Sequence, residues 1–162
     1  MTKNFWMFLG AGLVIVAAGL SFVFLGTEKN HLELNGKILK VRVLSLSPDA
    51  SLVVADFRVN NPSGIDFVVK DVQMTLDPAS GDPVHGTIAS KADIDTIFQY
   101  QKLVGPKYND VLSLKDTVKA GKTVDFMTAA RFELSEQAIA ARKELHLHLE
   151  DLDGPVAELT EH

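Results

Sequence analysis

The sequence predicts a mainly β protein: an antiparallel β-sandwich with one inserted helix, behind a single N-terminal transmembrane helix. Three observations support this prediction. Residues 5–26 contain no charged side chain. From residue 39 onward, apolar and polar residues alternate with a period of two in several segments, as in strands that bury one face. Clusters of Gly, Pro, Asn and Asp separate these segments and indicate turns.

Composition excludes several classes of function. The 162 residues contain no cysteine and carry a formal net charge of −5. Without cysteine there is no thiol nucleophile, disulfide scaffold or thiolate metal site. An acidic chain is also a poor general binder of nucleic acid, which requires a dense Lys/Arg surface, so we expect no nucleic-acid partner. The residues after position 26 are enough for one domain with a core and too few for two.

The uncharged run at 5–26 is long enough to cross a bilayer. At a rise of about 1.5 Å per residue it extends roughly 33 Å, against a hydrocarbon core of about 30 Å. A cleaved signal peptide would end near Ala17–Gly19, but the apolar run continues beyond that point, which favours an uncleaved signal anchor. The large side chains expected in the lipid bilayer are Phe5, Trp6, Phe8, Leu13, Val14, Ile15, Val16, Leu20, Phe22, Val23 and Phe24.

The charges that flank this run predict its orientation. Lys3 precedes the span, whereas Glu28 and Lys29 cancel just after it, so we expect residues 1–4 in the cytoplasm. Residues 27–33 would be a linker, and residues 34–162 a periplasmic or otherwise extracytoplasmic domain of a single-pass inner-membrane protein. With Lys3 inside, the remainder has 15 basic and 21 acidic residues, a net charge of −6. That charge favours a basic protein patch as partner over an anionic lipid surface.

Strands are expected wherever the period of two holds. In 52–60, Val53, Ala55, Phe57 and Val59 would face the core and the alternate residues would face water. Parity changes near Val43–Leu44 and near Lys70–Asp71 predict irregularities, the latter a β-bulge that lets Ile65, Phe67, Val69, Val72, Met74 and Leu76 all point inward. The other predicted strands are 39–46, 84–88, 112–118, 124–134, 145–150 and a short one after residue 155, seven or eight in all.

Two helices interrupt the strands. Ser90 and Asp93 form an N-terminal capping pattern, and Gly105–Pro106 ends the element, which would cover the sandwich as a lid or plug. Ser135 is expected to cap a shorter helix that runs through about Lys143. The apolar and aromatic residues of the first helical segment suit either core packing or an interaction surface: Ile94, Ile97, Phe98, Tyr100, Leu103 and Tyr108.

Two kinds of polar cluster have residues that could bind a metal ion. His146, His148 and Glu150 would share one strand face, and two such histidines can bind zinc. No third convergent ligand is evident in the sequence. A solvated face is therefore the preferred interpretation, and no metal or other cofactor is expected. Asp93–Asp95 and Asp151–Asp153 suit helix capping and turns better than calcium. Without a nucleophile elbow, a Walker sequence or a dinucleotide fingerprint, an enzyme is not predicted.

One stretch resembles a known family. Leu52–Leu76, with Asn61–Pro62 between two apolar strands, is similar to the signature of late-embryogenesis-abundant group 2 domains and the related water-stress and hypersensitive-response domain. The resemblance implies an immunoglobulin- or fibronectin-like β-sandwich, with Asn61–Pro62 as the family's turn and no shared catalytic residues. The chain departs from that pattern after Ile88, where the helix is inserted.

These observations predict a noncatalytic, membrane-anchored β-sandwich. It would act as a structural or accessory subunit that braces or binds a membrane protein complex on its extracytoplasmic face. Its expected partners are the lipid bilayer, through the N-terminal helix, and other subunits of that complex. The alternative is a stress-protective domain, or one that binds an apolar ligand or lipid, of the late-embryogenesis-abundant group 2 type.

Overall fold

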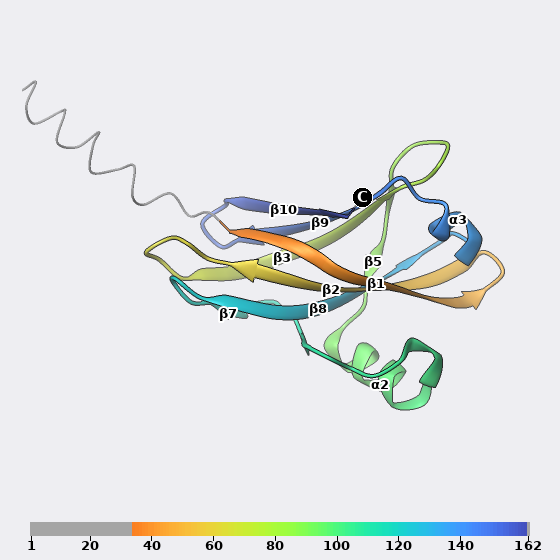
Figure 1. Ribbon diagram of the computed structural model, residues 1–162, viewed down its shortest axis with the longest axis horizontal. Helices are drawn as coiled ribbons and strands as arrows, with labels where there is room; N and C mark the ends of the chain where they lie inside the picture. The colour runs from red at the N-terminus through yellow and green to blue at the C-terminus, as the bar shows by residue number, and fades with distance from the viewer. Residues whose placement is uncertain (1–33, 162) are drawn as a thin grey trace, which may run out of the picture. The chain divides into compact units, whose positions relative to one another are not determined.

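The computed structural model describes residues 34–161, which form two β-sheets packed face to face (Figure 1). The first sheet contains β1 (Asn35–Ser47), β2 (Ala50–Asn60), β8 (Thr123–Phe132), β5 (Thr87–Ile88) and β6 (Asp110–Val111). The second contains β10 (Val156–Glu161), β9 (Glu144–Asp151), β3 (Phe67–Asp77), β4 (Val84–His85) and β7 (Thr117–Val118). This confirms the predicted β-sandwich.

The sheets are built in the order β1-β2-β8-β5 and β10-β9-β3-β4. The short strand β6 also pairs with β8, and β7 also pairs with β3. All pairings are antiparallel except that of β6 with β8, which is parallel. The described residues hold more strands than expected for two reasons. The predicted strand 84–88 is divided into β4 and β5, and β6 lies just before the predicted strand 112–118, of which only Thr117–Val118 forms a strand.

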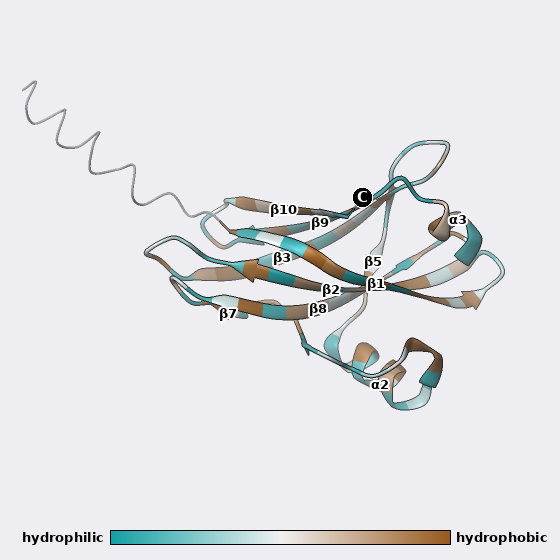
Figure 2. Ribbon diagram, in the orientation of Figure 1, coloured by the Kyte–Doolittle hydropathy of each residue, from teal (hydrophilic) through white to brown (hydrophobic). Residues whose placement is uncertain are grey.

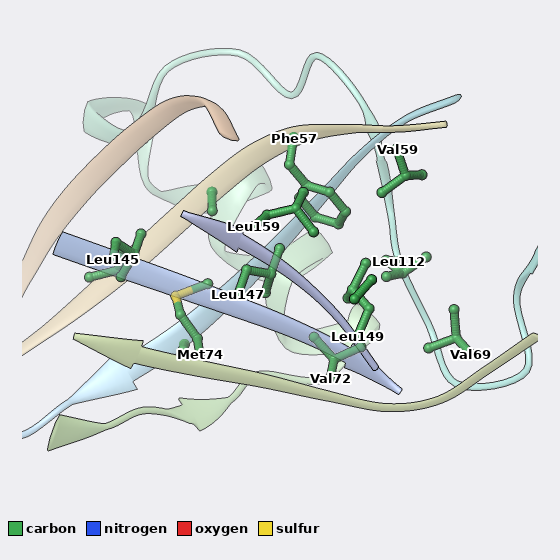
Figure 3. Close-up of a cluster of buried hydrophobic side chains, with 14 of the residues drawn as sticks. Phe57, Val59, Val69, Val72, Met74, Leu112, Leu145, Leu147, Leu149 and Leu159 are labelled. Carbon is green, nitrogen blue, oxygen red and sulfur yellow. The ribbon is translucent and has the colours of Figure 1, made fainter. Parts of the chain in front are cut away.

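The main core lies between the two sheets. Figure 2 shows hydrophobic and hydrophilic residues alternating along β1 and β8, which is the pattern that gives each strand an inner and an outer face. Figure 3 shows side chains of both sheets meeting in this core. Its buried members include Val53, Ala55, Phe57, Val59, Phe132, Leu145, Leu147, Leu149 and Leu159.

The bulge predicted in β3 is present. The register between β3 and β9 shifts between Val69 and Asp71. As a result Phe67 and Val69 before the bulge, and Met74 and Leu76 after it, are all buried. Ile65 was expected inward but is exposed, because it lies in the turn that precedes the strand.

The outer face of β2 is only partly open to water: Arg58 is exposed as predicted, but Asp56 is buried. A helix, α2 (Lys91–Tyr100), and a 3-10 helix, η1 (Lys102–Val104), lie on the side of the β1-β2-β8 sheet that faces away from the second sheet (Figure 1). They form a second core, whose buried members are Leu44, Leu52, Val54, Ile94, Val104, Val111, Met127 and Ala129. The irregularity expected near Val43–Leu44 is absent, because the pairing of β1 with β2 is continuous there. Leu44 departs from the alternation because it is buried in the outer core.

The predicted strand at 84–88 crosses from one sheet to the other. β4 pairs with β3 in the second sheet, and β5 pairs with β8 in the first. Gly86 lies at the crossing, where a Cβ atom would come within 2.8 Å of the Ala130 Cβ and 2.7 Å of the Phe132 Cζ. Only a residue without a side chain lets the chain pass so close to β8.

The helices begin where the capping residues predict. Ser90 Oγ accepts from the backbone N–H of Asp93, and Ser135 Oγ accepts from that of Ala138. The second helix, α3 (Glu136–Ala140), is shorter than predicted. It ends before Lys143, because β9 begins at Glu144.

Among residues 34–161 no helix has the length and apolarity needed to cross a membrane. The predicted cytoplasmic end, transmembrane helix and linker, residues 1–33, fall outside the described residues.

Candidate functional site

The segment 91–109, here called the insertion, is fastened to the outer face of the first sheet by Arg42 of β1. The Arg42 Nη1 donates to the carbonyl oxygens of Val104 and Pro106, both at 3.0 Å. Its Nη2 donates to Asp56 Oδ2 of β2 at 2.6 Å. Both side chains of this ion pair are buried, with 9% of Arg42 and 4% of Asp56 exposed. A buried charge is tolerated when it is paired and hydrogen-bonded in this way.

Further contacts of this ion pair reach along the insertion. Asp56 Oδ1 accepts a hydrogen bond from Asn109 Nδ2 at 2.9 Å. The Arg42 guanidinium also lies over the rings of Phe98 and Tyr108, at 5.0 and 5.6 Å from the ring centroids. Arg42 and Asp56 therefore hold the helix, the turn at 104–106 and the return segment together.

The insertion is also braced internally. Lys107 Nζ donates to Asp95 Oδ1 at 2.6 Å, which links α2 to the segment that follows η1. This hydrogen bond is the largest cause that holds the pKa of the Asp95 carboxyl below its ordinary value. Ile94 and Val104 are buried in the outer core, while Ile97 and Phe98 are half-buried against it.

Three of the residues predicted for an interaction helix remain largely exposed. The exposed fractions are 71% for Tyr100, 87% for Leu103 and 60% for Tyr108. We call these three residues the insertion surface. The six residues of the sequence prediction thus divide by role: Ile94, Ile97 and Phe98 fasten the insertion, and Tyr100, Leu103 and Tyr108 are displayed by it.

The Asn61–Pro62 turn is a structural element. Asn61 is fully buried, and its Nδ2 donates to the carbonyls of Ile65 and Val118, at 2.8 and 3.0 Å. Its Oδ1 accepts from both the backbone N–H and the Oγ of Ser63. The side chain therefore satisfies the polar groups of the turn between β2 and β3 and ties that turn to β7.

The histidines proposed as weak metal candidates lie on one face of β9, with ring centroids 6.3 Å apart. The acid closest to His146 is not Glu150 but Glu158, whose Oε1 lies 2.9 Å from His146 Nδ1. Glu150 pairs with Lys70 at 2.5 Å, whereas His146 Nε2 lies 3.5 Å from Asp77 Oδ2 and 3.4 Å from Glu144 Oε2.

The aspartates considered for calcium have the capping and turn roles that the sequence favoured. Asp93 Oδ2 accepts from Ser90 Oγ at 2.7 Å in the first turn of α2. Asp151 is buried, and its carboxylate accepts from the backbone N–H groups of Val68 and Asp153.

A cleft of about 530 Å³ opens beside the start of α2, between β3 of one sheet and β5 of the other. Its apolar lining comes from Val72, Ile88, Ala89, Leu112 and Leu114, and its polar lining from Asp71, Ser90, Lys91 and Ser113. Val72 and Leu112 belong to the main core, so the cleft lies at the edge of that core.

Sequence reasoning missed Arg42, Asp56 and Asn109, although they fix the insertion. Arg42 and Asp56 are 14 residues apart, and Asn109 is 53 residues from Asp56. The alternation of apolar and polar residues in 52–60 predicts that Asp56 faces water. A basic residue flanked by valines in a strand is the one signal that could have suggested a buried partner for Arg42.

No family model matches the chain, and no curated protein does. Three solved structures are similar in part. A candidate lipoprotein, ycdA, from Bacillus subtilis has a TM-score of 0.50 and 13% identity, and the match covers 82% of this chain but 37% of that one. An uncharacterised β-sandwich protein from Clostridium difficile has a TM-score of 0.35 and 9% identity over 82% of each chain. A protein of unknown function from Listeria monocytogenes has a TM-score of 0.34 and 19% identity, over 77% of this chain and 71% of that one. The likeness to the Bacillus protein concerns the fold alone.

Proposed function

We propose that this protein is a noncatalytic accessory subunit, tethered to the inner membrane by residues 5–26, that binds a partner protein on the extracytoplasmic side through its insertion surface. The tether rests on the length and uncharged composition of that run. In this proposal the sandwich is of the immunoglobulin or fibronectin type, as the resemblance to late-embryogenesis-abundant group 2 domains implies.

The main support for the binding role is that the insertion displays exposed apolar and aromatic side chains on a backbone held against the sheet. Leu103 is 87% exposed, yet the adjacent Val104 is buried and its carbonyl accepts from Arg42. Displaying a large apolar side chain on a fixed backbone lowers the entropy that binding would cost. Tyrosine is enriched in protein interfaces because its ring contributes area and its hydroxyl a hydrogen bond.

The charges near the insertion surface suggest the chemistry of the partner. Lys40 Nζ lies 5.3 Å from the Tyr108 ring centroid, and Lys102 adjoins Leu103. A matching partner surface would have an apolar centre with acidic groups at its edge. This differs from the basic patch that the net charge of the whole domain favours, because that net charge includes acidic residues of the second sheet, such as Asp77, Glu144 and Glu158 around His146.

Purification of the full-length protein in mild detergent tests this proposal. We expect the wild-type protein to elute from native membranes in a complex larger than the monomer. Leu103→Asp should release it as a monomer, and Leu152→Asp should not, since Leu152 is a comparably apolar exposed residue in the turn before β10. Elution of the wild-type protein as a lone monomer would contradict the accessory role.

The cleft beside α2 favours a second candidate, the binding of an apolar ligand. Its volume of about 530 Å³ lies in the range of small-molecule pockets, its lining is mostly apolar, and Lys91 at its edge suits an anionic head group. Delipidated full-length protein should then bind a fluorescent fatty acid, and Ala89→Trp, which fills the cleft, should abolish that binding. No binding by the delipidated wild-type protein would exclude this candidate.

A further inference from the structure

The outer face of the second sheet gathers three metal-binding side chains from two strands. Asp77 lies at the end of β3, and Glu144 and His146 lie at the start of β9, with Asp77 directly opposite Glu144 in the strand pairing. One ligand atom from each lies within 4.8 Å of the other two. The backbone N–H of Lys143 donates to the Asp77 carbonyl at 2.8 Å, which fixes the two strand ends against each other.

The distances around His146 match those of a bound transition metal. His146 Nε2 lies 3.5 Å from Asp77 Oδ2 and 3.4 Å from Glu144 Oε2. In a tetrahedral zinc site with metal–ligand bonds of about 2.0–2.2 Å, neighbouring ligand atoms are separated by roughly 3.3–3.5 Å. These two separations therefore have the values expected between ligand atoms of such a site.

A fourth residue holds the imidazole in the orientation that such a site needs. His146 Nδ1 lies 2.9 Å from Glu158 Oε1 on β10. When Nδ1 carries the proton and donates it to this carboxylate, the lone pair of a neutral imidazole is on Nε2, facing Asp77 and Glu144. Metal-binding histidines in proteins are held in this way by a carboxylate on their second nitrogen.

The charge at this place also favours a cation. Two carboxylates directly opposite each other on neighbouring antiparallel strands repel, and Glu158 adds a third near the same ring. A divalent ion bound between the two opposite carboxylates would reduce this repulsion.

From these four observations we infer that Asp77, Glu144 and His146 form a site for a divalent transition-metal ion, with Glu158 as the positioning residue. One imidazole and two carboxylates suit Zn²⁺ or Co²⁺ better than Mg²⁺ or Ca²⁺, which prefer oxygen ligands alone. His148 is not one of the three ligands, although it shares the face of His146. The site lies on the opposite side of the sandwich from the insertion surface and does not depend on the proposed function.

Titration of the chelator-treated, full-length protein with ZnCl2 and CoCl2 tests this inference. We expect His146→Ala and Asp77→Asn each to weaken binding of both ions by at least about tenfold, and Glu158→Gln to weaken it less. His148→Ala should leave the affinity within about twofold of wild type, because that residue lies outside the ligand set. Zn²⁺ should raise the unfolding temperature of the wild-type protein and of His148→Ala, but not that of Asp77→Asn.

Thermal unfolding without metal shows that each variant is folded before it is titrated. Wild-type protein that binds Zn²⁺ no more tightly than His146→Ala would overturn the inference. An equal loss in His146→Ala and His148→Ala, with none in Asp77→Asn, would also overturn it, because the ion would then be held by the histidine pair.

Discussion

The guanidinium of Arg42 and the carboxylate of Asp56 form a buried ion pair, with Nη2 and Oδ2 2.6 Å apart, between the first sheet and the insertion. The same guanidinium donates hydrogen bonds to the carbonyl oxygens of Val104 and Pro106. One arginine thus joins two neighbouring strands to a segment more than 60 residues away in the chain. Arg42 therefore holds in place the backbone that displays Tyr100, Leu103 and Tyr108.

Replacing Arg42 by Met should destabilise the domain strongly. The substitution leaves the Asp56 carboxylate buried without its cation and two carbonyls without their donor, which costs about 3–5 kcal/mol. Urea unfolding of the full-length protein measures the loss. Arg58→Met is the control, because Arg58 pairs with Asp125 in a position open to solvent. Its loss should be far smaller. Equal losses in the two variants would contradict the role given to Arg42.

Asn61→Ala should be much more destabilising than Asn60→Ala. Asn61 is buried and makes hydrogen bonds to Ile65, Val118 and Ser63, so its removal leaves several buried groups unsatisfied at about 1–3 kcal/mol each. Asn60 makes one side-chain hydrogen bond, with Thr123, in an exposed position. Thermal or urea unfolding compares the two, and a smaller loss at Asn61 than at Asn60 would refute the structural role of the turn.

Gly86→Ala should destabilise the crossing between the sheets by about 1–3 kcal/mol, because the added Cβ would overlap Ala130 and Phe132. Gly64→Ala provides the control: a Cβ there meets nothing within 4 Å. That change should be neutral or slightly stabilising, since alanine restricts the unfolded chain. Urea unfolding midpoints that rank the two variants in the opposite order would show that the chain does not cross at Gly86.

Stability should fall in acid partly through Asp125. The hydrogen bond from Arg58 holds the pKa of this carboxyl below its ordinary value of 3.8. A carboxyl whose pKa is lower in the folded protein contributes stability above its unfolded pKa and loses that contribution as the pH falls through the folded pKa. Asp125→Asn should therefore unfold more easily than wild type near pH 7, by a small amount because the pair is exposed. The difference should shrink as the pH falls below 3.8 and through the lowered pKa of Asp125. A difference that grows in acid would contradict this assignment.

The sequence predicted those parts of the fold that depend on neighbours along the chain. The change of parity from Val69 to Val72 revealed the bulge in β3, and Ser90 with Asp93 revealed the start of α2. It did not predict that the outer face of β2 is covered at Leu52, Val54 and Asp56. Asp56 looks like a water-facing residue until the insertion, which follows it by more than 30 residues, is folded onto it.

The candidate sites show the same division. The apolar and aromatic residues of the insertion could be recognised, but Ile94 and Leu103 could not be assigned to opposite roles without the position of Arg42. For His146 the sequence indicated partners at the same spacing on one strand, His148 and Glu150. Asp77 is 69 positions earlier in the chain, and only the register of β3 against β9 brings it to His146.

Site-specific photocrosslinking in native membranes tests the central proposal most directly. A photoreactive phenylalanine analogue at Leu103 or Tyr108 should give a crosslinked product with one partner protein. The same analogue at Leu152 or Val156, which are comparably exposed at the other sheet, should give none. Arg42→Met should weaken the product at Leu103, provided that the variant is folded. Crosslinks at Leu152 and Val156 but not at Leu103 and Tyr108 would contradict the proposal that the insertion surface binds the partner.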